Sequence, residues 1–180
     1  MWNSIDIHIS RITGNRLQSE QRPLVVGGSV NKSYIVNNDK QTYFLKLNQS
    51  SQLALFEAEA LGLQKIPDTG AIRTPNPVFT GRSADSCYIV MECLSMGNGK
   101  SHSFMDMGCG LAKMHKKANI SQKGFSWYMQ NNIGSTPQIN TWTNNWGEFY
   151  AQNPLGYQFK LVTKRRRKFS PSRGANSKNS

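Results

Sequence analysis

The sequence of 180 residues has no long apolar run. No stretch approaches the roughly 18 apolar residues that a membrane-spanning helix needs. The first residues, MWNSIDIHISRI, also lack the basic segment and apolar core of a secretory signal. A mean hydropathy of −0.56 is typical of a water-soluble protein. The sequence therefore predicts a cytoplasmic protein with no membrane partner.

Cysteine is scarce, with three residues in the whole chain. An odd number of cysteines without C-x-x-C spacing argues against a disulfide framework and against a cysteine-based metal site. Cys87 and Cys93 lie in or beside an apolar run, and Cys109 lies in a helical pattern. We therefore predict three buried free thiols and no metal ligands among them.

Acidic residues are also few, since 10 Asp and Glu stand against 22 Lys and Arg and leave a net charge of +12. Residues 164–180 hold seven of the basic residues and no acid, so the rest of the chain carries only +5. The abrupt change at Lys164 predicts a disordered basic tail. A frameshift or premature end in a longer reading frame would produce such a tail. The alternative is a segment that contacts nucleic acid non-specifically through phosphates.

Two apolar segments with a glycine pair between them lie at residues 24–36. Apolar, β-branched runs at residues 24–26 and 30–36 flank Gly27, Gly28 and Ser29. A glycine pair supplies the positive φ angles of a tight hairpin turn. It also lets backbone N–H groups approach a phosphate closely. The sequence therefore predicts two strands joined by a turn that could hold phosphate.

A lysine and a glutamate in the next two elements form a predicted pair. Lys46 belongs to a third strand over residues 43–47, and residues 53–66 show the apolar arc of a helix capped by Ser50 or Ser51. Glu59 falls inside that arc, whereas Glu57 falls outside it. A carboxylate inside the arc is costly unless it meets a cation. In a kinase N-lobe such a lysine holds the ATP phosphates and pairs with the helix glutamate. A plain meander with both charges on the surface is the alternative.

Two further apolar runs, at residues 78–80 and 87–91, complete a set of five predicted strands with one helix after the third. This order predicts an α+β fold over residues 1–94, in which a five-stranded antiparallel sheet forms a protein-kinase-like N-lobe. Residues 1–22 fit either a strand or a short helix. A hinge whose backbone groups meet adenine is predicted at Met91, Glu92, Cys93 and Leu94.

Residues 95–163 are predicted to be a linker followed by the first helices of a C-lobe. Residues 104–117 form a helical pattern, and we expect its apolar stripe to be core; the stripe contains Phe104, Met107, Leu111 and Met114. Residues 125–146 are a long polar segment with aromatic ends, and residues 148–162 return to a helical pattern. Asp106 is predicted to be an exposed or capping residue and not a metal ligand.

Several motifs in the sequence resemble the fructosamine/ketosamine 3-kinase family, whose kinase-like fold is shared with aminoglycoside phosphotransferases. The most specific of them is GSTPQINTW at residues 134–142. Shorter matches are GGSVN at 27–31, FLKLN at 44–48, FEAE at 56–59, VME at 90–92 and LAKMH at 111–115. The resemblance runs in the same order over about residues 3–162.

This resemblance implies ATP-dependent phosphorylation, with magnesium, of the sugar 3-hydroxyl of ketosamines, including glycated lysines on proteins. It implies that Lys46 binds the ATP phosphates, that Glu59 positions Lys46, and that residues 91–94 hold adenine. The substrate-side residues that it implies are Gln138, Asn140 and Trp142.

The chain departs from the family pattern in its catalytic motifs. None of the three histidines, His8, His102 and His115, precedes Gly-Asp as in the family's HGD-type loop, and the D-P-A motif that holds Mg²⁺ is missing. We therefore predict no catalytic residue, no metal ligand and a C-terminally truncated kinase that is inactive or partial. The alternatives are a non-catalytic nucleotide-binding module and a basic-tailed nucleic-acid-binding protein. Apolar surface left by a missing C-lobe predicts self-association.

Overall fold

The computed structural model describes residues 2–17, 21–26, 30–38, 40–117 and 124–169. The chain divides into two compact units. The first comprises Met1–Asn119 with Asn131–Thr136, and the second comprises Ile120–Gln130 with Pro137–Ser180. Across the described ranges, no helix combines the length and the apolar character needed to cross a bilayer.

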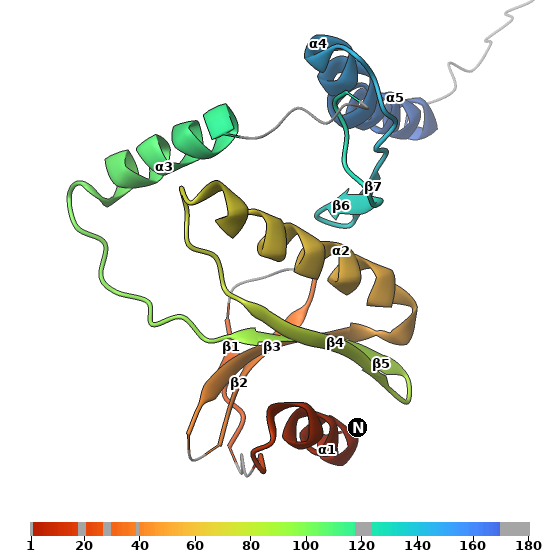
Figure 1. Ribbon diagram of the computed structural model, residues 1–180. Coiled ribbons are helices and arrows are strands. Elements are labelled where there is room, and N and C mark those ends of the chain that lie inside the picture. The colour runs from red at the N-terminus through yellow and green to blue at the C-terminus, as the bar shows by residue number, and fades with distance from the viewer. Residues whose placement is uncertain (1, 18–20, 27–29, 39, 118–123, 170–180) are drawn as a thin grey trace, which may run out of the picture. The chain divides into compact units, whose positions relative to one another are not determined.

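A five-stranded antiparallel sheet forms the centre of the first unit, in the order β1-β2-β3-β5-β4 (Figure 1). The predicted α+β fold with one helix inserted after the third strand is confirmed. The second strand begins later than predicted, at Lys32 instead of residue 30. The strands are β1 Leu24–Val25, β2 Lys32–Asn37, β3 Thr42–Gln49, β4 Pro77–Ser83 and β5 Ser86–Glu92.

The N-terminal segment is a helix, α1, over Trp2–Thr13. Ile5 and Ile9 lie four residues apart, so they share one helix face, and both are fully buried. They pack on one face of the sheet against Val36, Leu45 and Tyr88. The strand that the sequence also allowed here does not form, because a helix can bury this isoleucine face against the sheet.

Helix α2, over Leu53–Lys65, covers the opposite face of the sheet (Figure 1). Its Phe56 packs against Ile89 and Met91 of β5. The predicted serine cap is wrong: residues Ser50–Gln52 form a 3₁₀ turn, and no side chain caps α2. The backbone N–H of Ser50 donates instead to the carbonyl of Asp85 at 2.8 Å, which ties this turn to the β4–β5 connection.

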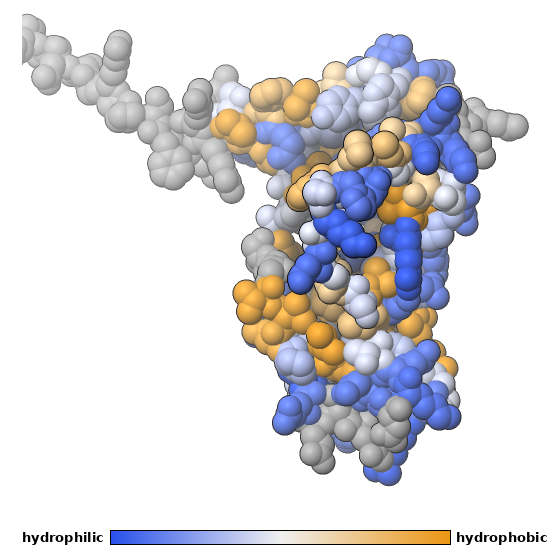
Figure 2. Space-filling view, turned by 90° about the vertical axis from the view of Figure 1, so that its left-hand side faces the viewer, coloured by the Kyte–Doolittle hydropathy of each residue, from blue (hydrophilic) through white to orange (hydrophobic). Residues whose placement is uncertain are grey.

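Helix α3 spans Ser103–Lys117, as its periodicity predicts, but the expectation that its apolar stripe is core is wrong. No residue of α3 is buried, and the side chain of Phe104 is 82% exposed. The helix contacts the rest of the first unit at Gly110, which lies against Ile72. Figure 2, which views the molecule from the α3 side, shows orange apolar areas among blue polar ones on the surface.

The predicted polar loop over residues 125–146 contains a β-hairpin. Its strands are β6 Asn131–Ile133 and β7 Thr136–Gln138. Outside these strands in the sequence, Phe125 and Thr143 exchange two backbone hydrogen bonds of 2.7 and 3.2 Å. Gly124 has φ +94°, and a Cβ there would lie 2.2 Å from the Thr143 carbonyl oxygen, so this position requires glycine.

The second unit ends in helices α4, Trp146–Tyr150, and α5, Gly156–Phe169, joined by a π-helical turn over Ala151–Leu155. Asn145 caps α4 by accepting a hydrogen bond from the Glu148 backbone N–H. The disorder predicted from Lys164 onward is wrong for residues 164–169, which continue α5. Lysine and arginine are good helix formers and are favourable near a helix C-terminus. Residues 170–180 of the predicted tail lie outside the described ranges.

Candidate functional site

Lys46 occupies the middle of the central strand β3. In the sheet it lies opposite Ser33 of β2 and Ile89 of β5. Side chains alternate between the two faces of a strand, so the face of Lys46 is the one that Phe44 and Ile89 share with α2. The adjacent residue, Leu45, is fully buried on the α1 face. The strand period therefore directs the lysine toward α2 and leaves the other face apolar.

Glu59 reaches Lys46 from helix α2. Its Oε1 lies 2.5 Å from the Lys46 Nζ, and the two side chains are 30% and 27% exposed. Glu57, which the helical arc placed outside the apolar face, is exposed. The ion pair expected from the sequence is therefore formed, in a partly open position where a ligand's anionic groups could reach the ammonium.

Two asparagines join residue 31, at the start of the described chain after residues 27–29, to strand β3. The Asn48 Nδ2 donates to the Asn31 Oδ1 at 2.6 Å. Asn48 lies two residues after Lys46 and so on the same face of β3. The three predicted phosphate-turn residues, Gly27, Gly28 and Ser29, lie outside the described residues, and their role stays a prediction. The Asn31–Asn48 contact connects the chain that follows this turn to the lysine strand.

The predicted hinge begins inside β5, and its first two residues, Met91 and Glu92, are paired with β3 as the last residues of that strand. Met91 is buried against α2. The backbone N–H of Glu92 donates to the Asn76 carbonyl at 2.8 Å, while its carboxylate pairs with Arg73 at 2.5 Å. A hydrogen bond from the Asn76 N–H, and second the Arg73 contact, lower the pKa of Glu92 below its ordinary value. Adenine contacts by residues 91–94 stay a prediction.

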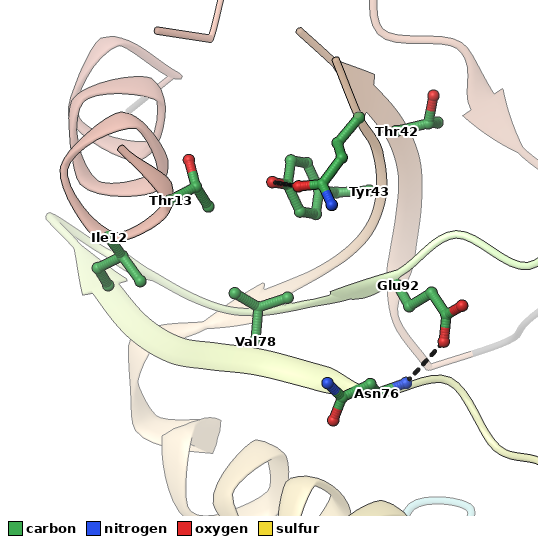
Figure 3. Close-up of a pocket in the computed structure, with 8 residues that line it drawn as sticks. Ile12, Thr13, Thr42, Tyr43, Asn76, Val78 and Glu92 are labelled. Carbon is green, nitrogen blue, oxygen red and sulfur yellow. Dashed lines mark hydrogen bonds between the residues drawn. The ribbon is translucent and has the colours of Figure 1, made fainter. Parts of the chain in front are cut away.

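A cavity of about 520 Å³ lies beside the hinge on the α1 face of the sheet. Figure 3 shows Tyr43 and Val78 lying between α1 and the Asn76–Glu92 hydrogen bond. Lys46 and Glu59 are on the opposite face and do not line this cavity. Its lining residues are Ile12, Thr13, Gln41, Thr42, Tyr43, Asn76, Val78 and Glu92.

The three predicted substrate-side residues lie at and after the end of β7, within the second unit. Asn140 is buried, and its Nδ2 donates to the Met129 carbonyl at 2.6 Å. The ring of Trp142 lies 5.5 Å from that of Tyr128, edge to face. Both contacts join the chain before β6 to the chain after β7. These two residues therefore have structural contacts in addition to the predicted substrate role, which for them and for Gln138 stays a prediction.

Carboxylates and cysteines in the described residues form no cluster of three or more that could hold a metal ion. Asp106 lies in the first turn of α3, 3.6 Å from His102, with its side chain largely exposed. The prediction of three buried thiols holds for Cys87, whose Sγ donates to the Gln49 carbonyl. It is wrong for Cys109, which is exposed, and for Cys93, which is half-buried, because helix α3 has no buried residue and Cys93 lies just after the end of β5.

Two contacts of this neighbourhood were missing from the predicted site, the Asn31–Asn48 hydrogen bond and the Arg73–Glu92 ion pair. The strand period signals Asn48, because it follows Lys46 by two residues and so lies on the same face of β3. The Arg73–Glu92 pair has no such signal, since it joins residues 19 positions apart through the meeting of β4 and β5.

A family model described as fructosamine kinase matches residues 1–177. A probable ketoamine kinase of Synechocystis sp. is 42% identical over 164 residues, which cover 91% of this chain and 55% of that protein. A chloroplastic protein-ribulosamine 3-kinase of Arabidopsis thaliana is 44% identical over 139 residues, covering 77% of this chain and 42% of that protein. The chain thus spans about half the length of the curated relatives it matches.

A solved structure shows the same fold. The crystal structure of a candidate fructosamine-3-kinase from Haemophilus somnus has a TM-score of 0.81 and 24% sequence identity, and the match covers 92% of this chain and 55% of that one. The five-stranded sheet with its inserted helix accordingly belongs to a kinase-like fold.

Proposed function

The chain belongs to the fructosamine kinase family, and from this membership we propose that its first unit is the nucleotide-binding lobe of an ATP-dependent ketosamine 3-kinase. The proposed reaction transfers the γ-phosphoryl group of ATP to the sugar 3-hydroxyl of a ketosamine, such as a glycated lysine of a protein. The observation that carries the proposal is the Lys46–Glu59 ion pair at 2.5 Å, between the central strand and its inserted helix.

The roles of the two residues follow from their chemistry. The Lys46 ammonium is a compact positive charge that can neutralise the oxygens of the α- and β-phosphates. Glu59 holds that ammonium at a fixed point above the sheet, so the lysine does not have to be ordered when the nucleotide arrives. A glycine turn at residues 27–29 and backbone groups of residues 91–94 would complete the contacts to phosphate and adenine.

Magnesium does not fit the described residues in the same way. Mg²⁺ takes carboxylate ligands together with phosphate oxygens, and the described part of the chain offers no acidic cluster near Lys46 other than Glu59, which is already paired. No step through the metal is therefore assigned to these residues. We infer that the chain binds nucleotide and that, as a partial kinase, it transfers phosphate poorly on its own.

Nucleotide-dependent stabilisation tests this function. We expect ATP at about 100 times its dissociation constant to raise the free energy of unfolding by about 2.7 kcal/mol, read out by thermal unfolding. Lys46→Met should abolish this stabilisation, because it removes the ammonium while keeping a long apolar side chain. The matched control is Lys32→Met, in which an exposed lysine of the neighbouring strand β2 is changed.

The outcomes separate the proposed roles. Stabilisation by ATP in the wild type and in Lys32→Met, but not in Lys46→Met, supports the nucleotide site. Equal stabilisation of all three chains would show that ATP binds elsewhere. Transfer of radiolabelled phosphate to a fructose-lysine derivative at the rate of a full-length relative would contradict the inference that this chain is a partial kinase.

A further inference from the structure

Glu92, at the end of β5, is joined by three contacts to the segment that enters β4. Its backbone N–H donates to the Asn76 carbonyl at 2.8 Å. One carboxylate oxygen, Oε1, pairs with Arg73 at 2.5 Å, and the other, Oε2, accepts from the Asn76 backbone N–H at 3.3 Å (Figure 3). Both carboxylate oxygens thus contact residues 73–76, so the Glu92 side chain joins that segment to the end of β5.

The segment depends on this side chain because its own backbone has few N–H groups to donate to the sheet. Pro75 and Pro77 have no N–H to donate, which leaves Asn76 as the donor between them. The register of β4 against β5 also shifts between Pro77 and Phe79. The Glu92 carboxylate therefore extends the connection between the two strands past an irregular place in the ladder.

The same segment is tied to helix α2 at its other side. The hydroxyl of Thr74 donates to the carbonyl of Leu63 at 3.0 Å. Leu63 lies one helical turn after Glu59 in the same helix, and backbone hydrogen bonds from residue i to i−4 join successive turns. A continuous series of contacts therefore joins the hinge residue Glu92 to the segment, the segment to α2, and α2 through Glu59 to Lys46.

We propose that Glu92 and Arg73 are positioning residues that clamp residues 73–76 between the hinge and α2, and so hold Glu59 against Lys46. The consequence for nucleotide affinity rests on the proposed function, whereas the clamping of α2 does not. An exposed ion pair contributes little to global stability, and the Arg73 side chain is 75% exposed. The role of the pair is therefore to fix the position of a segment, with little effect on the unfolding transition.

Amide hydrogen exchange of the full chain tests the clamp directly. We expect Arg73→Ala and Glu92→Gln each to speed exchange in peptides from α2 about fivefold, with an unchanged unfolding midpoint, and to weaken ATP binding by about the same factor. The exchanged pair, Arg73→Glu with Glu92→Arg, should restore part of the protection, because the ion pair re-forms while the Asn76 N–H loses its acceptor.

The matched control is Lys65→Ala, which removes an exposed ion pair to Asp68 at the end of α2 itself. This variant should leave exchange in the rest of α2 unchanged. Unchanged α2 exchange in both Arg73→Ala and Glu92→Gln would overturn the proposal, and so would equal effects in Lys65→Ala. If the wild-type chain fails to bind ATP, the proposed function is wrong, while the exchange data still decide whether the clamp exists.

Discussion

The two faces of the five-stranded sheet differ in what they bury. On the α1 face, Ile5, Ile9, Leu45 and Tyr88 form a core that is closed to solvent. On the α2 face, apolar contacts around Phe56 surround an ion pair whose side chains remain more than a quarter exposed. A charge pair is costly in a closed core, so a lysine in the middle of the central strand, paired and partly open to solvent, indicates that the α2 face has a use other than stability.

The adjacent residues Leu45 and Lys46 show this difference between the two faces. Their side chains leave the same strand in opposite directions, one into the closed core and one toward Glu59. Substitutions at the first should change stability, and substitutions at the second should change ligand binding.

The largest expected effect is on the α1 face. Leu45→Ala should lower the free energy of unfolding by about 2–5 kcal/mol, because it leaves a cavity at a fully buried site. Urea unfolding followed by circular dichroism measures this loss. The matched control is Leu24→Ala on the edge strand β1, where the side chain is 58% exposed and the expected change is within about 0.5 kcal/mol. Equal losses in the two variants would contradict the assignment of the closed core to the α1 face.

A smaller effect on the same face should depend on pH. The His8 Nδ1 lies 2.5 Å from the Tyr88 hydroxyl, and burial, with a second contribution from Arg11, lowers the pKa of His8 below its ordinary value of 6.5. The unfolded chain therefore takes up a proton at a higher pH than the folded chain. Stability should fall as the pH decreases from about 6.5 through the folded pKa.

Urea unfolding at pH 7.5 and pH 5.5 measures this dependence. His8→Gln should reduce the difference in stability between the two pH values, since the titrating group is gone. His102→Gln is the control, because His102 lies in the turn just before helix α3, where its side chain is exposed and outside the core. If the pH dependence of stability persists unchanged in His8→Gln, another titrating group causes it.

The smallest effect on stability is expected on α3, which has an apolar stripe but no cover. Phe104→Ser should change the free energy of unfolding by about 0.5 kcal/mol or less, because the ring is 82% exposed. It should also raise the monomer fraction in light scattering if exposed apolar surface causes self-association. Phe56→Ser, at a buried phenylalanine of α2, is the matched comparison and should destabilise strongly. A large loss in Phe104→Ser would show that the α3 stripe is packed in solution.

Much of the first unit could be predicted from local pattern. The apolar runs predicted all five strands, and helical spacing placed Glu59, but not Glu57, on the face that meets the sheet. Two errors, by contrast, come from contacts between residues far apart in the sequence. The serine cap of α2 failed because the Ser50 N–H bonds to Asp85, and the polar loop contains a hairpin because Phe125 and Thr143 pair across it.

The sequence by itself determined which residues share a face, because the periods of strands and helices are local properties of the backbone. It thereby placed the side chains of Lys46 and Leu45 on opposite faces of the sheet and predicted a carboxylate near the lysine. Only the tertiary structure decided which faces are covered, since periodicity describes α2 and α3 alike and cannot say that α2 packs on the sheet while α3 stays exposed. The Arg73–Glu92 pair was likewise decided there, because it forms only when β4 and β5 bring the two residues together.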